Sequence, residues 1–241
     1  MKIKLTTEKH RRTQKRCAKQ SERNVSNMKI CEFIRTSFID YPDNICAVVF
    51  TKECNMNCKY CHNKALSSTN KYIEVDQVLQ FLNKRKNLLD GITITGGEPT
   101  LCKGLYEFCK NIKSFGYKIK LDTNGSNPKL LNKLIDDNLV DYIAMDIKSS
   151  PEHYHEICGL SFDHIKDSID IIKRIKCYEF RTTLYPKVTK TDIVKIIQII
   201  NTDKYYIQQY RETEFDDTKP YSDTYVKQLC NELQVSYRGI N

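Results

Sequence analysis

Residues 45–63 read ICAVVFTKECNMNCKYCHN, and this stretch decides the fold that the sequence predicts. It opens with an apolar run rich in β-branched residues, 45–51, which is typical of a strand buried on both faces. Directly after this run, Cys54, Cys58 and Cys61 place three thiols at spacings of four and three residues. Thiolates this close together can hold one metal centre, so the loop after the strand is a candidate site.

Outward from this stretch, strand-like and helix-like segments alternate along the chain. Five further strand candidates lie at 91–95, 117–121, 142–145, 178–184 and 204–208. Segments with apolar residues three and four apart lie between and after them, at 75–82, 105–115, 130–135, 165–175, 193–200 and 226–233. Six such units predict an α/β fold, an incomplete (β/α)6 barrel with right-handed crossovers. Ligands of such folds bind at the carboxyl ends of the strands.

Charge is unevenly distributed along the 241 residues, whose formal net charge is +9. Residues 1–27 hold nine Lys or Arg against two Glu, which is +7 and leaves about +2 for the remainder. We expect 1–27 to be a disordered basic extension and 28–241 to be the folded domain. A functional basic arm and a start at Met28 both remain open. The folded part gives no strong electrostatic reason to expect nucleic acid.

The cysteine content and the apolar segments indicate a reduced, cytoplasmic protein. No apolar run approaches the roughly 18 residues of a membrane span, and the basic start has no apolar signal region. Eleven cysteines in a long, Lys-rich chain do not resemble a small disulfide scaffold. Eight of them stand singly and are expected to act as small buried hydrophobes: Cys17, Cys31, Cys46, Cys102, Cys109, Cys158, Cys177 and Cys230.

Polar residues follow the predicted strands at the points where those strands end. They are Gly96-Gly97-Glu98-Pro99, Asp122-Thr123-Asn124-Gly125, Asp146-Ile147-Lys148, Arg181 and Gln208-Gln209-Tyr210-Arg211. Because parallel strands deliver their carboxyl ends to one rim, these groups predict a large polar ligand beside the metal. The thiol spacing alone leaves two metals open: an iron–sulfur cluster with one free iron, or a zinc completed by His62.

The cysteine motif, with an aromatic residue before Cys61 and a following Gly-Gly-Glu-Pro, resembles the radical S-adenosylmethionine (SAM) superfamily. Within it, 36–42, 60–63, 122–125 and 145–148 resemble the activating enzymes of glycyl radical enzymes. Together with 180–183 and 208–211, the likeness is greatest to the branch that activates anaerobic ribonucleoside-triphosphate reductase. The resemblance covers residues 28–241 and implies an incomplete barrel of the radical SAM type.

The resemblance also implies cofactors and their ligands. Cys54, Cys58 and Cys61 would hold one 4Fe-4S cluster with an open iron, where SAM is cleaved to a 5′-deoxyadenosyl radical. Gly96, Gly97 and Glu98 would hold the methionyl amine, Tyr60 and His62 would lie near the adenine, and Asp122, Thr123, Asp146 and Lys148 would contact SAM or a monovalent cation. A weaker interpretation makes Asp146 and Lys148 an exposed ion pair worth about 0–1 kcal/mol.

A partner protein is implied as well, because the radical must reach a glycine loop of a glycyl radical enzyme. Asp40 and Arg181 are candidate contacts to that loop, and Arg211 stands where related enzymes have a histidine. No second cysteine group follows, so the electron would come from a flavodoxin or ferredoxin. Three alternatives are an activase of pyruvate formate-lyase, a small-substrate enzyme such as 7-carboxy-7-deazaguanine synthase, and a zinc-stabilised module whose basic tail binds nucleic acid.

Overall fold

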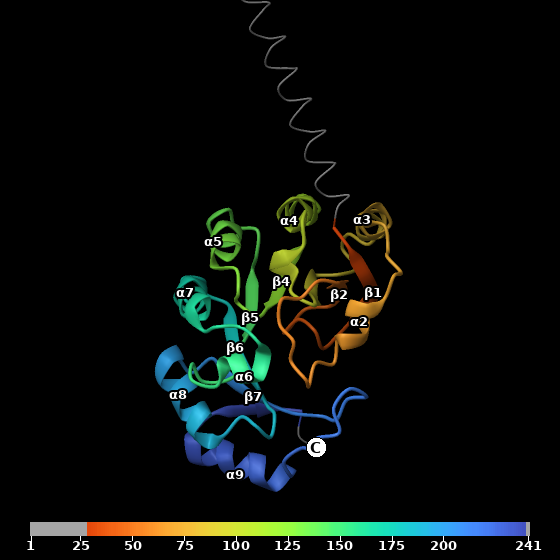
Figure 1. Ribbon diagram of the computed structural model, residues 1–241. Coiled ribbons are helices and arrows are strands. Elements are labelled where there is room, and N and C mark those ends of the chain that lie inside the picture. Colours follow the sequence, from red (N-terminus) through yellow and green to blue (C-terminus); the bar gives the residue numbers. More distant parts are fainter. Residues whose placement is uncertain (1–27, 240–241) are drawn as a thin grey trace, which may run out of the picture.

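The computed structural model describes residues 28–239, which form one curved, open sheet with helices along its outer side (Figure 1). The eight strands lie in chain order; β1 is antiparallel to β2, and all other neighbours are parallel. Within 28–239 no pairing joins β1 to β8, so the barrel is not closed. The strands are β1 (Ile30–Ser37), β2 (Cys46–Thr51), β3 (Gly91–Gly96), β4 (Lys118–Thr123), β5 (Tyr142–Asp146), β6 (Tyr178–Leu184), β7 (Tyr205–Gln209) and β8 (Ser236–Arg238).

Helices connect the parallel strands and cover the outer face of the sheet. They are α2 (Lys64–Ser68), α3 (Val75–Lys84), the 3-10 helix η1 (Pro99–Leu101), α4 (Leu105–Ser114), α5 (Pro128–Asp136), α6 (Tyr154–Cys158), α7 (Asp163–Ile172), α8 (Lys190–Ile200) and α9 (Asp223–Leu233). None of these helices is long and apolar enough to span a bilayer.

The predicted α/β incomplete barrel is confirmed, and its six predicted strands correspond to β2 through β7. The prediction missed both edge strands. Strand β1 interleaves charged residues with apolar ones, and β8 has three residues that are all exposed, so neither shows a long apolar run. The predicted extension 1–27 lies outside the described residues.

Residues on the two faces of the strands differ in chemistry because successive side chains point to opposite faces. Outward-facing residues such as Val49, Leu121 and Ile143 join the main apolar core beneath the helices. Inward-facing Val48 packs in a second, smaller apolar cluster that closes one part of the interior, together with Tyr41, Cys46, Phe50 and Tyr142. The rest of the inward face carries charged side chains, which the next subsection describes.

A buried carboxylate, Asp192, holds the loop after β5 against the start of α8. It accepts hydrogen bonds from Ser150 Oγ at 2.5 Å and from the backbone N of Thr189 at 2.8 Å, and His153 Nδ1 lies 2.8 Å away. Thr189 and Asp192 also form a reciprocal capping box at this helix end. Asp192 therefore positions the loop that begins with Lys148.

We predict that Asp192→Ala lowers the free energy of unfolding by about 3 kcal/mol, because it leaves several buried donors without an acceptor. Urea denaturation measures this loss. The matched control is Asp170→Ala, at an exposed position of α7, which should change stability by less than about 0.5 kcal/mol.

Asp192→Ala should also remove one contribution to the pH dependence of the free energy of unfolding. Burial alone would raise the pKa of Asp192, but hydrogen bonds from Ser150 and Thr189 outweigh burial and hold this pKa below its usual 3.8. A lowered carboxyl pKa stabilises the fold above the unfolded pKa and ceases to do so as pH falls. The stability gap between wild type and variant should therefore be full above about pH 5 and narrow below pH 4. A gap that does not change with pH would contradict this assignment.

Candidate active site

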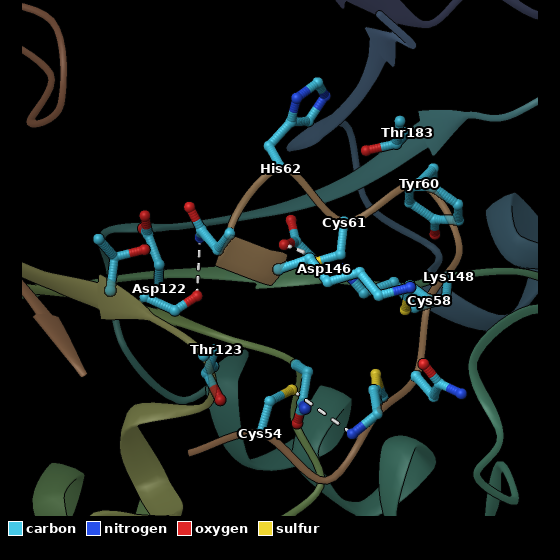
Figure 2. Close-up of a pocket in the computed structure, with 18 of the residues that line it drawn as sticks. Cys54, Cys58, Tyr60, Cys61, His62, Asp122, Thr123, Asp146, Lys148 and Thr183 are labelled. Carbon is cyan, nitrogen blue, oxygen red and sulfur yellow. Dashed lines mark hydrogen bonds and ion pairs between the residues drawn. The ribbon is translucent and has the colours of Figure 1, made fainter. Parts of the chain in front are cut away.

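A cavity of about 340 Å³ lies at the carboxyl ends of the parallel strands, beneath the loop that carries the three cysteines (Figure 2). Successive strands and the loops that follow them contribute its walls. The lining includes Cys54, Cys58, Tyr60, Cys61 and His62 from the loop after β2, Gly96 and Gly97 from β3, Asp122 and Thr123 from β4, Asp146 and Lys148 from β5, Arg181 and Thr183 from β6, and Gln208 from β7. The structure thus brings together most of the predicted cofactor-binding residues.

The three motif cysteines are free thiols that surround one part of this cavity (Figure 2). Cys54 is exposed, Cys61 is half-buried and Cys58 is buried. Burial raises the pKa of Cys54 and raises that of Cys58 to about 12, so a metal centre that binds here must displace their protons.

The arrangement of donors disfavours a mononuclear zinc site. Zinc holds its four ligands about 2.0 to 2.3 Å from a single point. Among residues 28–239, no three Cys, His, Asp or Glu side chains are placed to hold one metal ion in this way. His62 also points away from the thiols in Figure 2. A 4Fe-4S cluster differs from zinc because each thiolate binds a different iron, so the three thiols need not meet at one point.

Asparagine side chains hold the cysteine loop in place. Asn63 Nδ2 donates to the carbonyl of Gly96 at 2.7 Å, which ties the end of the loop to β3. Asn55 Oδ1 accepts from Asn124 Nδ2 at 3.0 Å, which ties its start to the loop after β4. The backbone N of Asn57 donates to the carbonyl of Cys158 at 2.9 Å. The thiols are therefore positioned by contacts to the ends of β3 and β4 and to the end of helix α6.

The two glycines at the end of β3, Gly96 and Gly97, allow a close approach to the start of the cysteine loop. The N–H of Gly97 donates to Thr51 O at 2.8 Å, and that of Glu98 donates to Glu53 O at 2.6 Å. A Cβ on Gly97 would overlap the carbonyl oxygen of Glu53, so only glycine fits there. Gly96 has a φ of +113°, which side-chain-bearing residues rarely adopt.

Glu98 is fully buried and does not line the cavity, unlike the predicted contact to a ligand amine. Its Oε1 accepts from the N–H of Thr100 at 3.0 Å and from Thr123 Oγ1 at 2.8 Å, and its Oε2 accepts from the N–H of Asn124 at 2.6 Å. Burial raises the pKa of Glu98, and these donors oppose the shift. The carboxylate therefore joins η1 to the end of β4 and so positions Thr123, which does face the cavity.

Charged side chains form the floor of the cavity. Arg181 Nε donates to Asp146 Oδ1 at 2.8 Å, and Lys148 Nζ lies 3.3 Å from Asp146 Oδ2. Burial alone would raise the pKa of Asp146, but Arg181 and Lys148 outweigh it and lower this pKa to about 2. The Lys148 side chain is only 15% exposed, so the pair is not the exposed surface ion pair that the weaker interpretation assumed. Within the described structure Asp146 is the ion-pair partner of Lys148, so the remaining N–H groups of the Lys148 ammonium can bind a ligand.

Tyr60 and His62 take opposite positions around the cysteine loop. The Tyr60 ring is buried and stacks on Tyr185 with 4.8 Å between centroids, whereas His62 is exposed at the cavity rim (Figure 2). Burial, and to a smaller extent the charge of Arg211, lowers the pKa of His62. Arg211 itself is exposed and does not line the cavity.

Asp40 lies outside the cavity, in the loop between β1 and β2. Its carboxylate accepts from Ser37 Oγ at 2.5 Å, and its carbonyl accepts from Thr93 Oγ1 at 3.1 Å. The neighbouring Phe38 and Ile39 are largely exposed. The proposed contacts of Asp40 and Arg211 with a partner stay predictions, whereas Arg181 lies in the cavity floor.

Four charged or polar residues that line the cavity or pair with the charges near it were missed by the sequence reasoning. They are Lys120, Glu179, Thr183 and Arg238. Lys120 is paired with Asp122, and Glu179 with both Arg181 and Arg238. A signal was present, because Lys120 precedes Asp122, and Glu179 precedes Arg181, by two positions within otherwise apolar strands. Such spacing puts both charges on one face.

Comparison with known proteins identifies the family of this chain. The family model of the radical SAM superfamily matches residues 48–200. Two relatives from Methanocaldococcus jannaschii are both named "putative glycyl-radical enzyme activating enzyme". One relative is 36% identical over 192 residues, which cover 75% of this chain and 79% of the relative. The other is 34% identical over 169 residues, which cover 67% of this chain and 64% of the relative.

A solved structure shares the fold. Streptococcus suis SuiB bound to S-adenosylmethionine matches with a TM-score of 0.61 at 15% identity. The match covers 78% of this chain, which spans about half (48%) of the SuiB chain.

We predict that Gly97→Ala lowers the free energy of unfolding by more than about 2 kcal/mol, because backbone atoms must move to admit the new Cβ. The displaced loop should also expose Cys58, so iodoacetamide should modify Cys58 faster than in the wild type. Peptide mass spectrometry measures this rate, with the exposed Cys54 as internal reference.

The matched control is Gly116→Ala. Gly116 has a φ of +91°, but no atom lies within 4 Å of the place that an alanine methyl group would take, so the variant should lose only about 1 to 2 kcal/mol. Equal alkylation of Cys58 in the two variants would contradict the proposed contact.

Proposed function

This chain belongs to the radical SAM superfamily, and we propose that it is the activating enzyme of a glycyl radical enzyme, anaerobic ribonucleoside-triphosphate reductase. The observation that carries the proposal is a single cavity in which three free thiols face a floor of buried, paired charges. The names of the two archaeal relatives support the class of activity. The choice of reductase rests on the motifs at 180–183 and 208–211.

We infer that Cys54, Cys58 and Cys61 bind one 4Fe-4S cluster and leave one iron to SAM. Together these cofactors supply a one-electron cleavage of the sulfonium that gives a 5′-deoxyadenosyl radical. The open position would follow from a donor set of three motif thiols, and His62, the further donor in the same loop, points away from them in Figure 2.

The charged floor suits the methionyl end of SAM. Lys148 has one carboxylate partner within residues 28–239 and keeps N–H groups for a ligand carboxylate. Asp122 and the Gly96–Gly97 backbone supply acceptors for the ligand amine. Asp122, Thr123 and Asp146 also form the oxygen-rich edge where a monovalent cation would bind. Tyr60 and His62 flank the end of the cavity that would take the adenine.

The partner and the electron donor are separate proteins in this proposal. The sheet is open between β1 and β8, which leaves a side entrance for a partner's glycine loop. Asp40, Arg181 and Arg211 are the proposed contacts to it. The sequence has no second cysteine group at metal-binding spacing, so a cytoplasmic flavodoxin or ferredoxin would deliver the electron.

We predict that Cys54→Ala, Cys58→Ala and Cys61→Ala each lose most of the iron and sulfide that anaerobic reconstitution introduces. The matched control is Cys158→Ala, because Cys158 is buried next to the cysteine loop but outside the motif. It should keep near-wild-type iron. Iron and sulfide assays decide this, and zinc without iron in the anaerobically purified wild type would reject the cluster.

We predict that Lys148→Met weakens SAM binding at least about tenfold, because it removes a buried cation worth about 1.5 to 3 kcal/mol to a charged acceptor. Equilibrium dialysis of the reconstituted protein measures the affinity. The control is Lys195→Met, which breaks an exposed pair with Glu152 and should leave binding unchanged. Unchanged binding in Lys148→Met would remove Lys148 from the site.

Activation itself is tested with the partner. Incubation of the reconstituted chain with reductant, SAM and anaerobic ribonucleotide reductase should give a glycyl doublet in electron paramagnetic resonance. If no signal appears with this reductase but a doublet appears with pyruvate formate-lyase, the partner is pyruvate formate-lyase instead. Isotope transfer from a small molecule into 5′-deoxyadenosine, with no partner present, would instead favour a small-substrate enzyme.

A further inference from the structure

Five charged residues form a continuous series of ion pairs that runs from the cavity floor to the last strand. We name it the charge chain, and its members are Asp122, Asp146, Glu179, Arg181 and Arg238. They lie on β4, β5, β6 and β8. Arg238 is the member on the edge strand, and it does not line the cavity.

Arg181 is shared among three carboxylates. Its Nε donates to Asp146 Oδ1 at 2.8 Å, and its NH1 lies 3.7 Å from Asp122 and 3.8 Å from Glu179. The Arg181 side chain is 12% exposed, so water competes little for it. Its position therefore depends on how strongly each carboxylate attracts it.

Glu179 is the member that must be neutralised from outside the cavity. Its side chain is 1% exposed, and Arg238 donates to both of its oxygens, at 2.9 and 2.8 Å. Tyr142 OH donates to Oε2 at 2.8 Å. Among residues 28–239, Arg181 and Arg238 are its ion-pair partners. A buried carboxylate that loses one cation draws strongly on the next one.

Strand β8 contributes Arg238 to the charge chain. Its three residues are all exposed, and among the described strands it pairs with β7 alone. The guanidinium of Arg238 also lies over the Tyr206 ring at 3.8 Å from the centroid. Arg238 therefore reaches a buried carboxylate from an exposed strand, with its side chain 41% exposed and that of Glu179 1% exposed. This bidentate contact indicates a role for the side chain beyond closing an edge.

We propose that Arg238 is a positioning residue for the cofactor site. It neutralises Glu179 and thereby leaves Arg181 to Asp146 and Asp122, the carboxylates that face the cavity. Without Arg238, Glu179 attracts Arg181 away from them, and Asp146 then pairs more tightly with Lys148. Lys148 is the cation proposed for the ligand carboxylate, so this inference rests on the proposed function for the identity of its ligand.

The test distinguishes an effect of the Glu179 charge on the site from a purely structural role of β8. Arg238→Met should weaken SAM binding about tenfold, as the loss of residues behind a ligand shell commonly does. Glu179→Gln combined with Arg238→Met removes both charges and should return the affinity to within about threefold of wild type. The control is Arg174→Met, which breaks an exposed pair with Asp136 and should have no effect.

A second readout needs no ligand. The 15N resonance of Arg181 Nε should move in Arg238→Met, because the hydrogen bond to Asp146 weakens, and should return in the double variant. Arg181→Lys identifies this resonance by its loss.

Two results would overturn the proposal. One is wild-type affinity in Arg238→Met; the other is an equal loss in the single and double variants, which would make β8 a structural element only. If the wild type itself binds no SAM, the proposed function fails, and the Arg181 resonance still decides whether Arg238 sets the position of Arg181.

Discussion

The cavity depends on the close approach of two backbone segments, the end of β3 and the start of the cysteine loop. Gly97 and Glu98 donate to Thr51 and Glu53 there, and no side chain fits at Gly97. This contact determines how far the thiols stand from the charged floor. The carboxylate of Glu98, buried directly behind it, then fixes the end of β4. Two ends of neighbouring strands are thus joined without any group entering the space that a ligand would use.

The buried charges of the floor satisfy one another before any ligand arrives. Asp146 has two cationic partners, and its low pKa shows that these outweigh the cost of burial. A site held in this way needs little rearrangement on binding, because its side chains are already ordered by their pairs. The exception is Lys148, whose single partner leaves hydrogen-bonding capacity for a ligand.

The sequence was most informative where chemistry is local. The six central strands follow from their apolar runs, and the cysteine loop follows from its spacing. The edge strands β1 and β8 were not predicted because strands with exposed faces lack such runs. The position of Glu98 escaped for another reason: its partners Thr123 and Asn124 are about 25 residues away, and only the folded sheet brings them together. The charge chain likewise depends on register across four strands, which no single segment reveals.

The pairing of Glu179 with Arg238 also affects how the chain folds as it is made. The two residues are 59 positions apart, so the arginine is made well after the carboxylate. Until it emerges from the ribosome, the nascent sheet carries a carboxylate in its interior that lacks its principal counter-charge. The inner face therefore reaches this electrostatic balance only after β8 has been made, whereas the apolar outer layer of the earlier units can assemble before it, helix by helix.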